Sequence, residues 1–349
     1  MALAVSKGFA LTPHSILAVT DFSAQGNHAL ARAALLCAEH GAKLKLVCLA
    51  YPGEAAPADA ATRLAHHALQ LSERHGIQVH AASRLAFTVE DVLSEVICAD
   101  LVAWGTAPVQ SLRSFFLGQP VEELLRRARR PVLVVRREAE HNYRSLIVAV
   151  DFTEVSAGLV DIGFALSKSA QVELFHAVSS VIEGKLRYAE VSDHAIKVYR
   201  SECRRYAQDR IFWLTDSYDT RRNRVSSAVG HGDAARQTVV QQQTRGAELI
   251  VVGRHPSSRL SDFFFDSTAN RILDYSHTDV LVVPHDHQPA SSAVAMKRLS
   301  MEAPAVRRVR AGAPNPPHFP NPAAVLGGSK KPQPNRSASD SCDLPIRVP

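Results

Sequence analysis

The chain contains one pattern twice, and this repeat limits the possible folds more than any other feature. The segment ILAVTDFS (16–23) recurs as LIVAVDFT (146–153). In each copy an apolar run of strand length ends at an aspartate, Asp21 or Asp151. Repetition of a whole structural unit predicts two similar domains in tandem.

Both copies continue with the same succession of helices and strands. Ser23 and Thr153 are candidate N-caps of a first helix. The other matching segments are a strand at 44–50 and 172–178, a long helix at 58–75 and 193–213, a strand ending in glycine at 101–105 and 249–253, and a closing apolar strand at 131–135 and 279–283. Strands that alternate with helices of this length favour right-handed crossovers and parallel sheets covered on both faces. The sequence therefore predicts an α/β fold with two tandem, doubly wound, Rossmann-like sheets of five parallel strands.

The boundaries of the two units follow from the same pattern. We expect a flexible start over 1–13, a first domain over 14–140 and a second domain over 142–285. The remaining residues, 286–349, hold 11 of the 19 prolines and a single aromatic side chain. Such a segment cannot bury enough apolar surface to offset the entropy lost on ordering, so we predict a disordered tail.

The positive charge of the chain is concentrated in this tail. The whole sequence has a formal net charge of +6, from 40 Lys or Arg and 34 Asp or Glu. The tail holds nine of the basic and four of the acidic residues, a net of +5, which leaves 31 basic and 30 acidic residues, a net of +1, elsewhere. We therefore expect no basic face on the folded part and no nucleic-acid partner.

The cysteines and the apolar runs indicate the compartment. No two of the five cysteines have CxxC spacing, and their odd number argues against a disulfide framework. No apolar run approaches the roughly 18 residues needed to span a bilayer. The first residues also lack the apolar core of a secretory signal. We expect a cytoplasmic protein without a membrane partner.

In each copy the fourth strand ends at a glycine that begins a loop of fixed length. The first loop reads GTAP (105–108), nine residues, then Gly118, and the second reads GRHP (253–256), nine residues, then Asp266. Glycine lets backbone approach a phosphate, and the helix that follows each loop supplies N–H donors. Because ligands of such sheets bind beyond the carboxyl ends of the strands, loop and aspartate would share one site per copy. Loops without a ligand, and aspartates that only cap helices, are the alternative interpretations.

This combination resembles the universal stress protein family, in which an aspartate after strand one accompanies a G-x2-G-x9-G-[ST] loop. The resemblance covers both repeats and leaves out the two ends of the chain. It implies that Asp21 and Asp151 contact the adenosine part of ATP or another adenine nucleotide, and that Leu49 and Ala177 line its pocket. It further implies that the residues facing the phosphates are Gly105, Gly118, Gln119, Gly253, Ser267 and Thr268. Mg²⁺ is expected only together with a nucleotide.

Both loops depart from the family pattern. The second glycine is replaced by Pro108 in one copy and Pro256 in the other, and proline has no backbone N–H to donate. Gln119 stands where the first copy needs a hydroxyl, and Asp266 stands where the second needs a glycine, so its charge repels a phosphate. Cationic side chains that would compensate in part are Arg113, Arg254 and Arg259. These changes predict weak nucleotide binding, with the first copy as the better site.

Two classes of function are compatible with these features. The resemblance implies a stress-response or regulatory protein that binds nucleotide or a regulatory protein partner and is not an enzyme. The alternative is an enzyme of the adenine-nucleotide α-hydrolase-like group that hydrolyses ATP or acts as a pyrophosphatase. That group needs an S-G-G-x-D-S loop after strand one, where this chain has Asp-Phe-Ser or Asp-Phe-Thr. We therefore expect a binding protein with no catalytic residue and no metal site of its own.

Three further segments have structural interpretations. His176 lies in an apolar strand and is expected to be a core histidine, and the His-Asp-His run at 285–287 is expected to be a solvated linker. The closing strands at 132–135 and 280–283 would each leave an unpaired edge. We expect them to pair, either between the two repeats of one chain or in a homodimer.

Overall fold

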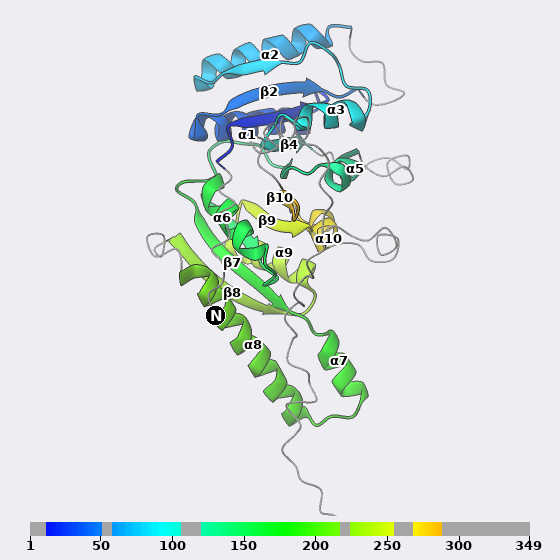
Figure 1. Ribbon diagram of the computed structural model, residues 1–349, viewed down its shortest axis with the longest axis vertical. Coiled ribbons are helices and arrows are strands. Elements are labelled where there is room, and N and C mark those ends of the chain that lie inside the picture. Colours follow the sequence, from blue (N-terminus) through cyan, green and yellow to red (C-terminus); the bar gives the residue numbers. More distant parts are fainter. Residues whose placement is uncertain (1–11, 51–57, 106–119, 217–223, 255–267, 288–349) are drawn as a thin grey trace, which may run out of the picture.

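The computed structural model of the chain describes residues 12–50, 58–105, 120–216, 224–254 and 268–287 (Figure 1). The expected flexible start and Pro-rich tail lie outside these residues, except for two residues of each. The described strands are β1 (Ser15–Thr20), β2 (Lys43–Cys48), β3 (Val79–Ala81), β4 (Leu101–Gly105), β5 (Val132–Val135), β6 (Ser145–Ala149), β7 (Gln171–Val178), β8 (Val225–His231), β9 (Leu249–Arg254) and β10 (Asp279–Pro284). The described helices are α1 (Ala24–His40), α2 (Ala60–His75), α3 (Val89–Val96), α5 (Pro120–Arg127), α6 (Ser156–Leu166), α7 (Val181–Tyr188), α8 (Asp193–Asp216), α9 (Ala234–Arg245) and α10 (Thr268–Tyr275).

All ten strands form one sheet, in the order β3-β2-β1-β4-β5-β10-β9-β6-β7-β8. We call β1–β5 with their helices the first repeat and β6–β10 with theirs the second repeat. Within each repeat every strand pair is parallel, which confirms the predicted pair of five-stranded Rossmann-like sheets. The two closing strands, β5 and β10, pair antiparallel with Leu133 opposite Leu281, and so join the two halves edge to edge.

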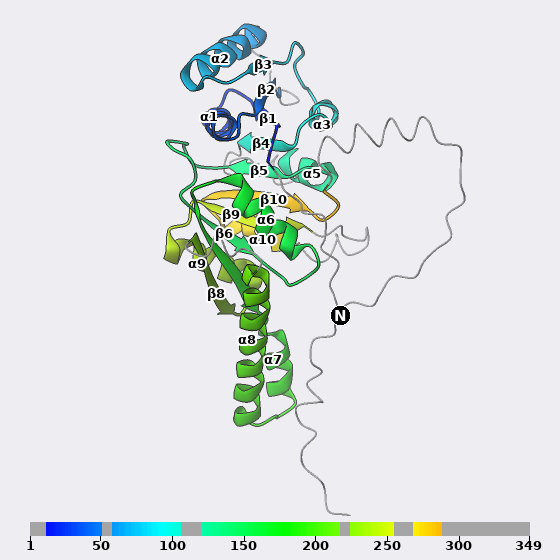
Figure 2. The same cartoon turned by 60° about the vertical axis from the view of Figure 1, so that its left-hand side comes forward.

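Helices cover both faces of this sheet, because the side chains of each buried strand alternate between two apolar cores. On one face Ile16 and Leu146 pack under α1, α2, α6 and α8. On the other face Leu17 and Ile250 pack under α3, α5, α9 and α10. Figure 2 shows α1 and α3 on opposite sides of β1 and β4. Each core contains residues of both repeats, so the two domains share their hydrophobic interior.

The first helices of the two repeats begin differently. Ser23 caps α1 as predicted, since its hydroxyl accepts the Gly26 N–H at 3.0 Å. The prediction that Thr153 caps the equivalent helix is wrong. Helix α6 begins only at Ser156, and Val155 precedes it without a side-chain cap. The hydroxyl of Thr153 bonds instead to Asp151, at 2.7 Å.

The second repeat carries a helical hairpin that sequence reasoning found only in part. Between β7 and β8 lie α7 and the 24-residue α8, which project from the sheet (Figure 1). Glu183 of α7 is buried and accepts two hydrogen bonds from Arg200 of α8, at 3.1 and 2.5 Å. His231 at the end of β8 lies 3.1 Å from the same carboxylate. The hydrogen bonds from Arg200 help to keep the pKa of Glu183 below its usual 4.5.

A buried polar cluster joins the two repeats beside the β5–β10 pair. Asp279 is fully buried, and its Oδ2 accepts the Tyr143 hydroxyl at 2.6 Å and lies 3.3 Å from Arg32 Nε. Its Oδ1 accepts the backbone N–H groups of Arg136 and Arg137, at 2.8 and 3.1 Å. The Arg32 guanidinium also lies 4.0 Å from the centre of the Tyr143 ring. One carboxylate of the second repeat therefore holds a helix of the first repeat and the linker.

The segment after β10 is not the solvated linker that the sequence suggested. His287 is 5% exposed, and burial lowers its pKa below 6.5. Asp286 lies 3.4 Å from Arg129 Nε in the first repeat. The start of the predicted tail therefore packs on the opposite repeat, because the β5–β10 junction brings the end of β10 close to it. Among the described helices none is long and apolar enough to cross a membrane.

Candidate functional site

The predicted nucleoside site of the first repeat is built on a tight turn at the end of β1. Asp21 Oδ1 accepts the N–H of Ser23 at 2.9 Å and also its hydroxyl. Phe22, at the centre of the turn, has a φ of 61°, a left-handed conformation that is uncommon for a bulky residue. Asp21 Oδ2 accepts no hydrogen bond from the described residues. The turn thus uses Oδ1 of the Asp21 carboxylate and leaves Oδ2 able to accept a hydrogen bond.

Leu49 and Gly105 lie next to the turn that Asp21 begins. Leu49 follows β2, is buried, and donates its N–H to Thr20 O at 2.9 Å. Gly105 ends the neighbouring β4, and a Cβ there would lie 2.0 Å from the Gln25 carbonyl oxygen. Gly105 is therefore required for close packing of β4 against the first turn of α1. The need for glycine here is structural, whether or not a phosphate approaches.

Helix α2 adds a cation and an imidazole next to this turn. The Arg63 guanidinium lies 4.4 Å from the centre of the Phe22 ring, and the His67 ring stacks on it at 6.0 Å. The pKa of the Cys48 thiol is raised from 9.0 to about 11, mainly by burial and also by the Asp21 charge, while the Arg63 charge opposes the rise. The Cys48 thiol is therefore protonated at neutral pH and is not a nucleophile.

The corresponding turn of the second repeat has the same backbone but more internal hydrogen bonds. Phe152 has a φ of 62°, and Asp151 Oδ1 accepts the N–H and the hydroxyl of Thr153 at 3.1 and 2.7 Å. It also accepts the hydroxyl of Ser156 at 2.8 Å. Ser156 stands where the first repeat has Gly26. A Cβ on Gly26 would lie 2.6 Å from Asp21 Oδ1, so the glycine leaves the space that Ser156 fills in the second repeat.

Aromatic side chains surround the second turn. Ala177 is half-buried on β7, and its neighbour His176 donates from Nδ1 to Val150 O at 2.8 Å. The His176 ring packs 4.2 Å from the Phe152 ring, and burial lowers its pKa below 6.5. Tyr206 of α8 meets Phe152 edge-on at 6.4 Å. His176 is thus hydrogen-bonded and packed, as expected of a core histidine.

The phosphate-loop residues are described only in part. Gly253 is the next-to-last residue of β9, and a Cβ there would lie 2.9 Å from Leu159 Cδ1 and 3.1 Å from His285 Nε2, both of them side-chain atoms. Thr268 is exposed in the first turn of α10. Arg254, a predicted compensating cation, donates to the carbonyl of Leu125 in the first repeat. The predicted residues outside the described part of the chain are Pro108, Arg113, Gly118, Gln119, Pro256, Arg259, Asp266 and Ser267.

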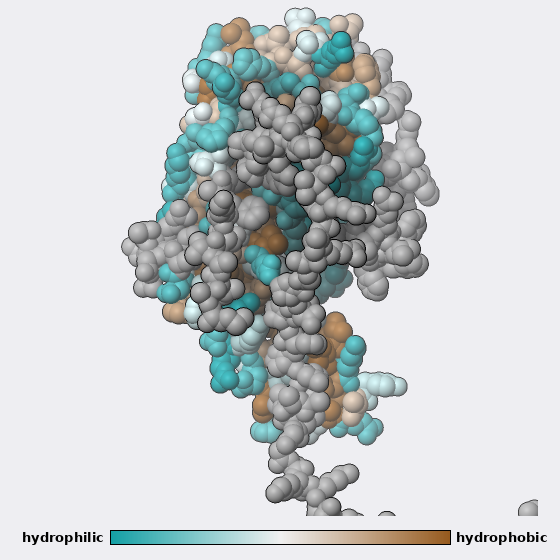
Figure 3. Space-filling model, in the orientation of Figure 1, coloured by the Kyte–Doolittle hydropathy of each residue, from teal (hydrophilic) through white to brown (hydrophobic). Residues whose placement is uncertain are grey.

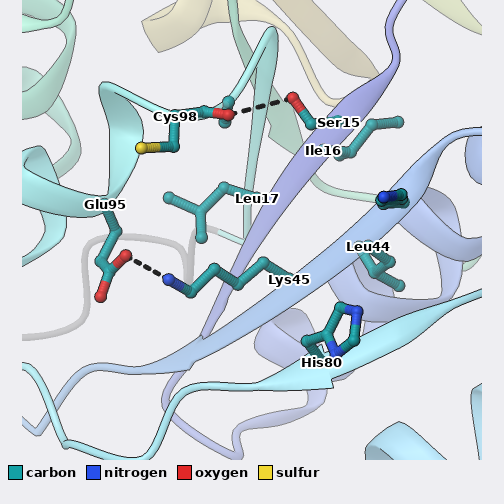
Figure 4. A pocket seen from close by; sticks show the side chains of 10 residues that line it. Ser15, Ile16, Leu17, Leu44, Lys45, His80, Glu95 and Cys98 are labelled. Carbon is teal, nitrogen blue, oxygen red and sulfur yellow. Dashed lines mark hydrogen bonds and ion pairs between the residues drawn. The ribbon is translucent and has the colours of Figure 1, made fainter.

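A cavity in the described part of the first repeat lies away from these turns. It has a volume of about 270 Å³ at the amino ends of β1 and β2, the opposite end of the strands from Asp21 (Figure 4). Ser15, Lys45, Glu95 and Cys98 contribute to its wall, and Lys45 and Glu95 form an ion pair. Within the described residues no three His, Cys, Asp or Glu side chains are grouped to hold a metal ion.

Comparison with known proteins identifies the family. The family model of universal stress proteins matches residues 13–136 and again residues 142–284. The chain belongs to the universal stress protein family. The two matches follow one another in sequence, so this is a tandem member. Membership supports a role in stress response.

Solved structures of universal stress proteins have the same fold. A universal stress protein from Archaeoglobus fulgidus DSM 4304 superposes with a TM-score of 0.60 at 12% identity, covering 79% of this chain and 97% of that chain. A functionally unknown protein from Pseudomonas aeruginosa PAO1 superposes with a TM-score of 0.56 at 20% identity, covering 83% and 98%. At these identities the likeness establishes the fold. No curated protein has significant sequence similarity to this chain.

Sequence reasoning missed the residues that α2 and α8 bring to the two turns. Arg63 and His67 belong to an exposed helix stretch rich in polar residues, which gives no indication that it faces Phe22. Tyr206 is equally inconspicuous in α8. The sequence offered one signal, the aspartate–phenylalanine pair that both copies repeat. In the structure the phenylalanine of each pair adopts the same unusual positive-φ conformation.

Proposed function

We propose that this universal stress protein is a cytoplasmic regulatory protein that binds an adenine nucleotide in its first repeat and catalyses no reaction. The observation that carries the proposal is the convergence of Asp21, Leu49 and Gly105 at the carboxyl ends of neighbouring strands. Such a strand end is where open α/β sheets hold their ligands. The second repeat places Asp151 at the equivalent strand end, but Asp151 accepts one more hydrogen bond from its own turn than Asp21 does.

The free carboxylate oxygen of Asp21 suits the ribose of a nucleoside. Ribose hydroxyls are hydrogen-bond donors, and a charge-assisted hydrogen bond to a carboxylate is roughly twice as strong as a neutral one. Asp21 Oδ2 has no donor among the described residues, whereas Oδ1 is already held by Ser23. The carboxylate is therefore fixed in orientation and still able to accept from a ligand.

Arg63 supplies the positive charge for a phosphate-bearing ligand. Its side chain is exposed and forms no ion pair within the described residues. Its position over Phe22 keeps the guanidinium beside the Asp21 turn. A guanidinium binds phosphate through a planar pair of donors, so Arg63 would attract the anionic part of the nucleotide. Mg²⁺ would enter with the phosphates.

The second repeat is less suited to a nucleotide. Asp151 Oδ1 already accepts three donors, two of them from Thr153 and one from Ser156. The rings of His176 and Tyr206 pack on Phe152 beside it. A ligand that approached Asp151 Oδ1 would have to displace these hydrogen bonds, and each net hydrogen bond lost costs about 1 kcal/mol.

The absence of catalysis is proposed from the chemistry of the groups next to Asp21. The Cys48 thiol is protonated at neutral pH, because burial raises its pKa to about 11. Asp21 Oδ1 accepts a hydrogen bond from its own turn, so the carboxylate is held in place to bind a ligand. A hydrolase would also need a general base or a held metal ion aimed at the phosphates, whereas the His67 ring beside this turn is stacked on Phe22.

Two measurements on the full chain test the proposal. The purified protein is denatured and the released small molecules are identified by mass spectrometry, and we expect an adenine nucleotide. Titration with ATP should then show weaker binding for Arg63→Ala and no change for Arg210→Ala, the matched arginine over Tyr206 in the second repeat. Equal binding by both variants would contradict the role of Arg63. Accumulation of ADP or AMP in wild type but not in Asp21→Ala would contradict the non-enzymatic proposal.

A further inference from the structure

Strand β8 ends the ten-stranded sheet on the side of the second repeat. Among the described residues, no strand pairs with its outer side. Gly232, just after β8, donates its N–H to Val178 O of β7 at 2.8 Å. Backbone groups of alternate residues point to the same side of a strand. The N–H groups of Val225, Ser227 and Val229 therefore point away from β7, toward the open edge.

This edge lacks the features that usually protect an open strand. Edge strands are commonly very short or carry charges or proline. The seven residues of β8, VSSAVGH, include no Lys, Arg, Asp, Glu or Pro. The charged residues at its ends are held within the chain, since Arg224 donates to Lys168 O and His231 pairs with Glu183. The opposite edge, β3, has only three residues.

A hollow with both polar and apolar lining lies beside the start of the open edge. It has a volume of about 190 Å³, lies between the end of α8 and the start of β8, and is lined by residues that include Phe212, Asp216 and Ser227. The Phe212 side chain is 63% exposed, and Trp213 next to it is 71% exposed. Exposed apolar surface on the same hairpin is visible over α7 in Figure 3. A strand added to β8 would cover Phe212.

The junction between the two repeats shows how such an edge is satisfied. There β5 and β10 pair antiparallel, the sheet continues across the pair, and helices of both repeats share each face. A two-fold axis perpendicular to the sheet would place β8 of a second copy antiparallel to β8 in the same way. In such a self-complementary contact residue i meets residue j and j meets i, so charges of one sign along the strand would face and repel one another across the axis. An uncharged β8 avoids this repulsion.

We propose that β8 is the contact surface for a second copy of this chain, with antiparallel β8–β8 pairing that extends the sheet across the dimer. The two α8 helices then lie on the same face, and the Phe212 side chains meet there. Two seven-residue strands with one aromatic pair fall at the low end of interface size, so we expect a dissociation constant in the range of about 1–100 µM.

The test is sedimentation equilibrium of the full chain over a range of concentrations. Ser227→Pro removes an N–H that points away from β7, so it should leave the fold intact, which circular dichroism and the thermal midpoint verify. We expect it to raise the dimer dissociation constant at least about tenfold. Ser227→Ala, which keeps the N–H, is the matched control and should leave the constant within about twofold of wild type.

Two results would overturn the proposal. A wild-type chain that stays monomeric at every concentration would do so, and a strand-forming peptide of another protein would then be the candidate occupant of the edge. A dimer that survives both Ser227→Pro and Phe212→Ser would also do so, because it must use another surface. If Ser227→Pro fails to fold, Ser227→Lys replaces it, since like charges at the pairing strand must weaken the dimer.

Discussion

The two repeats share a backbone and differ in the side chains at the same turn. Phe22 and Phe152 have φ values of 61° and 62°, and each follows an aspartate that accepts the N–H two residues on. The first repeat has Gly26 where the second has Ser156, whose hydroxyl bonds to Asp151. The residue at this position therefore decides whether Oδ1 of the aspartate accepts two donors from its own turn, as in Asp21, or three, as in Asp151. A conserved frame therefore does not imply a conserved ligand.

The helical segment that follows the second strand of each repeat adds to the difference between the two turns. In the first repeat α2 has 16 residues and places Arg63 over Phe22. In the second repeat α8 has 24 residues and places Tyr206 against Phe152. The first turn thus has a cation beside it and the second has an aromatic cover. The proposed nucleotide site and the proposed association surface therefore lie in different repeats.

The largest expected effect concerns the junction between the repeats, where a carboxylate of the second repeat holds Arg32 of the first repeat. Asp279 of the second repeat bonds both the linker and Arg32, and it is fully buried. Asp279→Asn leaves the Arg32 charge buried without its partner, which costs about 3–5 kcal/mol. We expect urea denaturation to show this loss in the free energy of unfolding.

The matched control for this variant is Tyr143→Phe. It removes one hydrogen bond to Asp279 but keeps the ion pair with Arg32. The expected loss is about 1–2 kcal/mol. If the two variants unfold with the same free energy, the ion pair contributes nothing at the junction, and the hydrogen bond to Tyr143 alone matters.

The next effect compares Gly105 and Gly253, the glycines at or next to the ends of the fourth strands. In Gly105→Ala the new Cβ would lie 2.0 Å from a backbone oxygen of Gln25, so the helix itself must move. In Gly253→Ala it would meet the end of the Leu159 side chain at 2.9 Å, which can rotate. We expect losses of about 3 kcal/mol and about 1 kcal/mol, measured by thermal denaturation. Equal losses would show that the two strand ends are packed alike.

The smallest effect is the pH dependence of stability that His176 of the second repeat contributes. Burial lowers the pKa of His176 below 6.5, so below that pH the unfolded chain binds a proton that the folded chain does not. The free energy of unfolding should therefore fall as the pH drops from about 6.5 through the folded-state pKa. His176→Gln, which can still donate to Val150 O, should lose less stability than wild type between pH 7 and pH 5. An identical pH profile for both proteins would mean that His176 is accessible to protons in the folded state.

The sequence predicts the frame of this molecule well, for a physical reason. Buried parallel strands are continuous apolar runs, so β1, β4 and β10 are recognisable without any knowledge of their neighbours. Helix α1 was equally clear, because Leu30, Ala33 and Cys37 fall on one face and are buried. The repeat then fixed the order of the elements.

The remaining features depend on contacts between distant segments. Arg32 and Asp279 lie at opposite ends of the folded chain. Nothing in the sequence around either residue indicates that the two form an ion pair. Thr153 looked like a helix cap, but Asp151 competes for its hydroxyl and the helix begins later, at Ser156. His287 looked solvated, and only the antiparallel junction brings it against the first repeat. Local patterns cannot report such long-range packing.

The central claim is that the first repeat binds the nucleotide and the second does not. Calorimetric titration of ATP into the full chain tests it directly, with Asp21→Ala and Asp151→Ala as a matched pair. We expect heat of binding in wild type, affinity reduced at least about tenfold in Asp21→Ala, and affinity unchanged in Asp151→Ala. Loss of binding in Asp151→Ala alone would contradict the assignment to the first repeat, and no heat from wild type would contradict nucleotide binding itself.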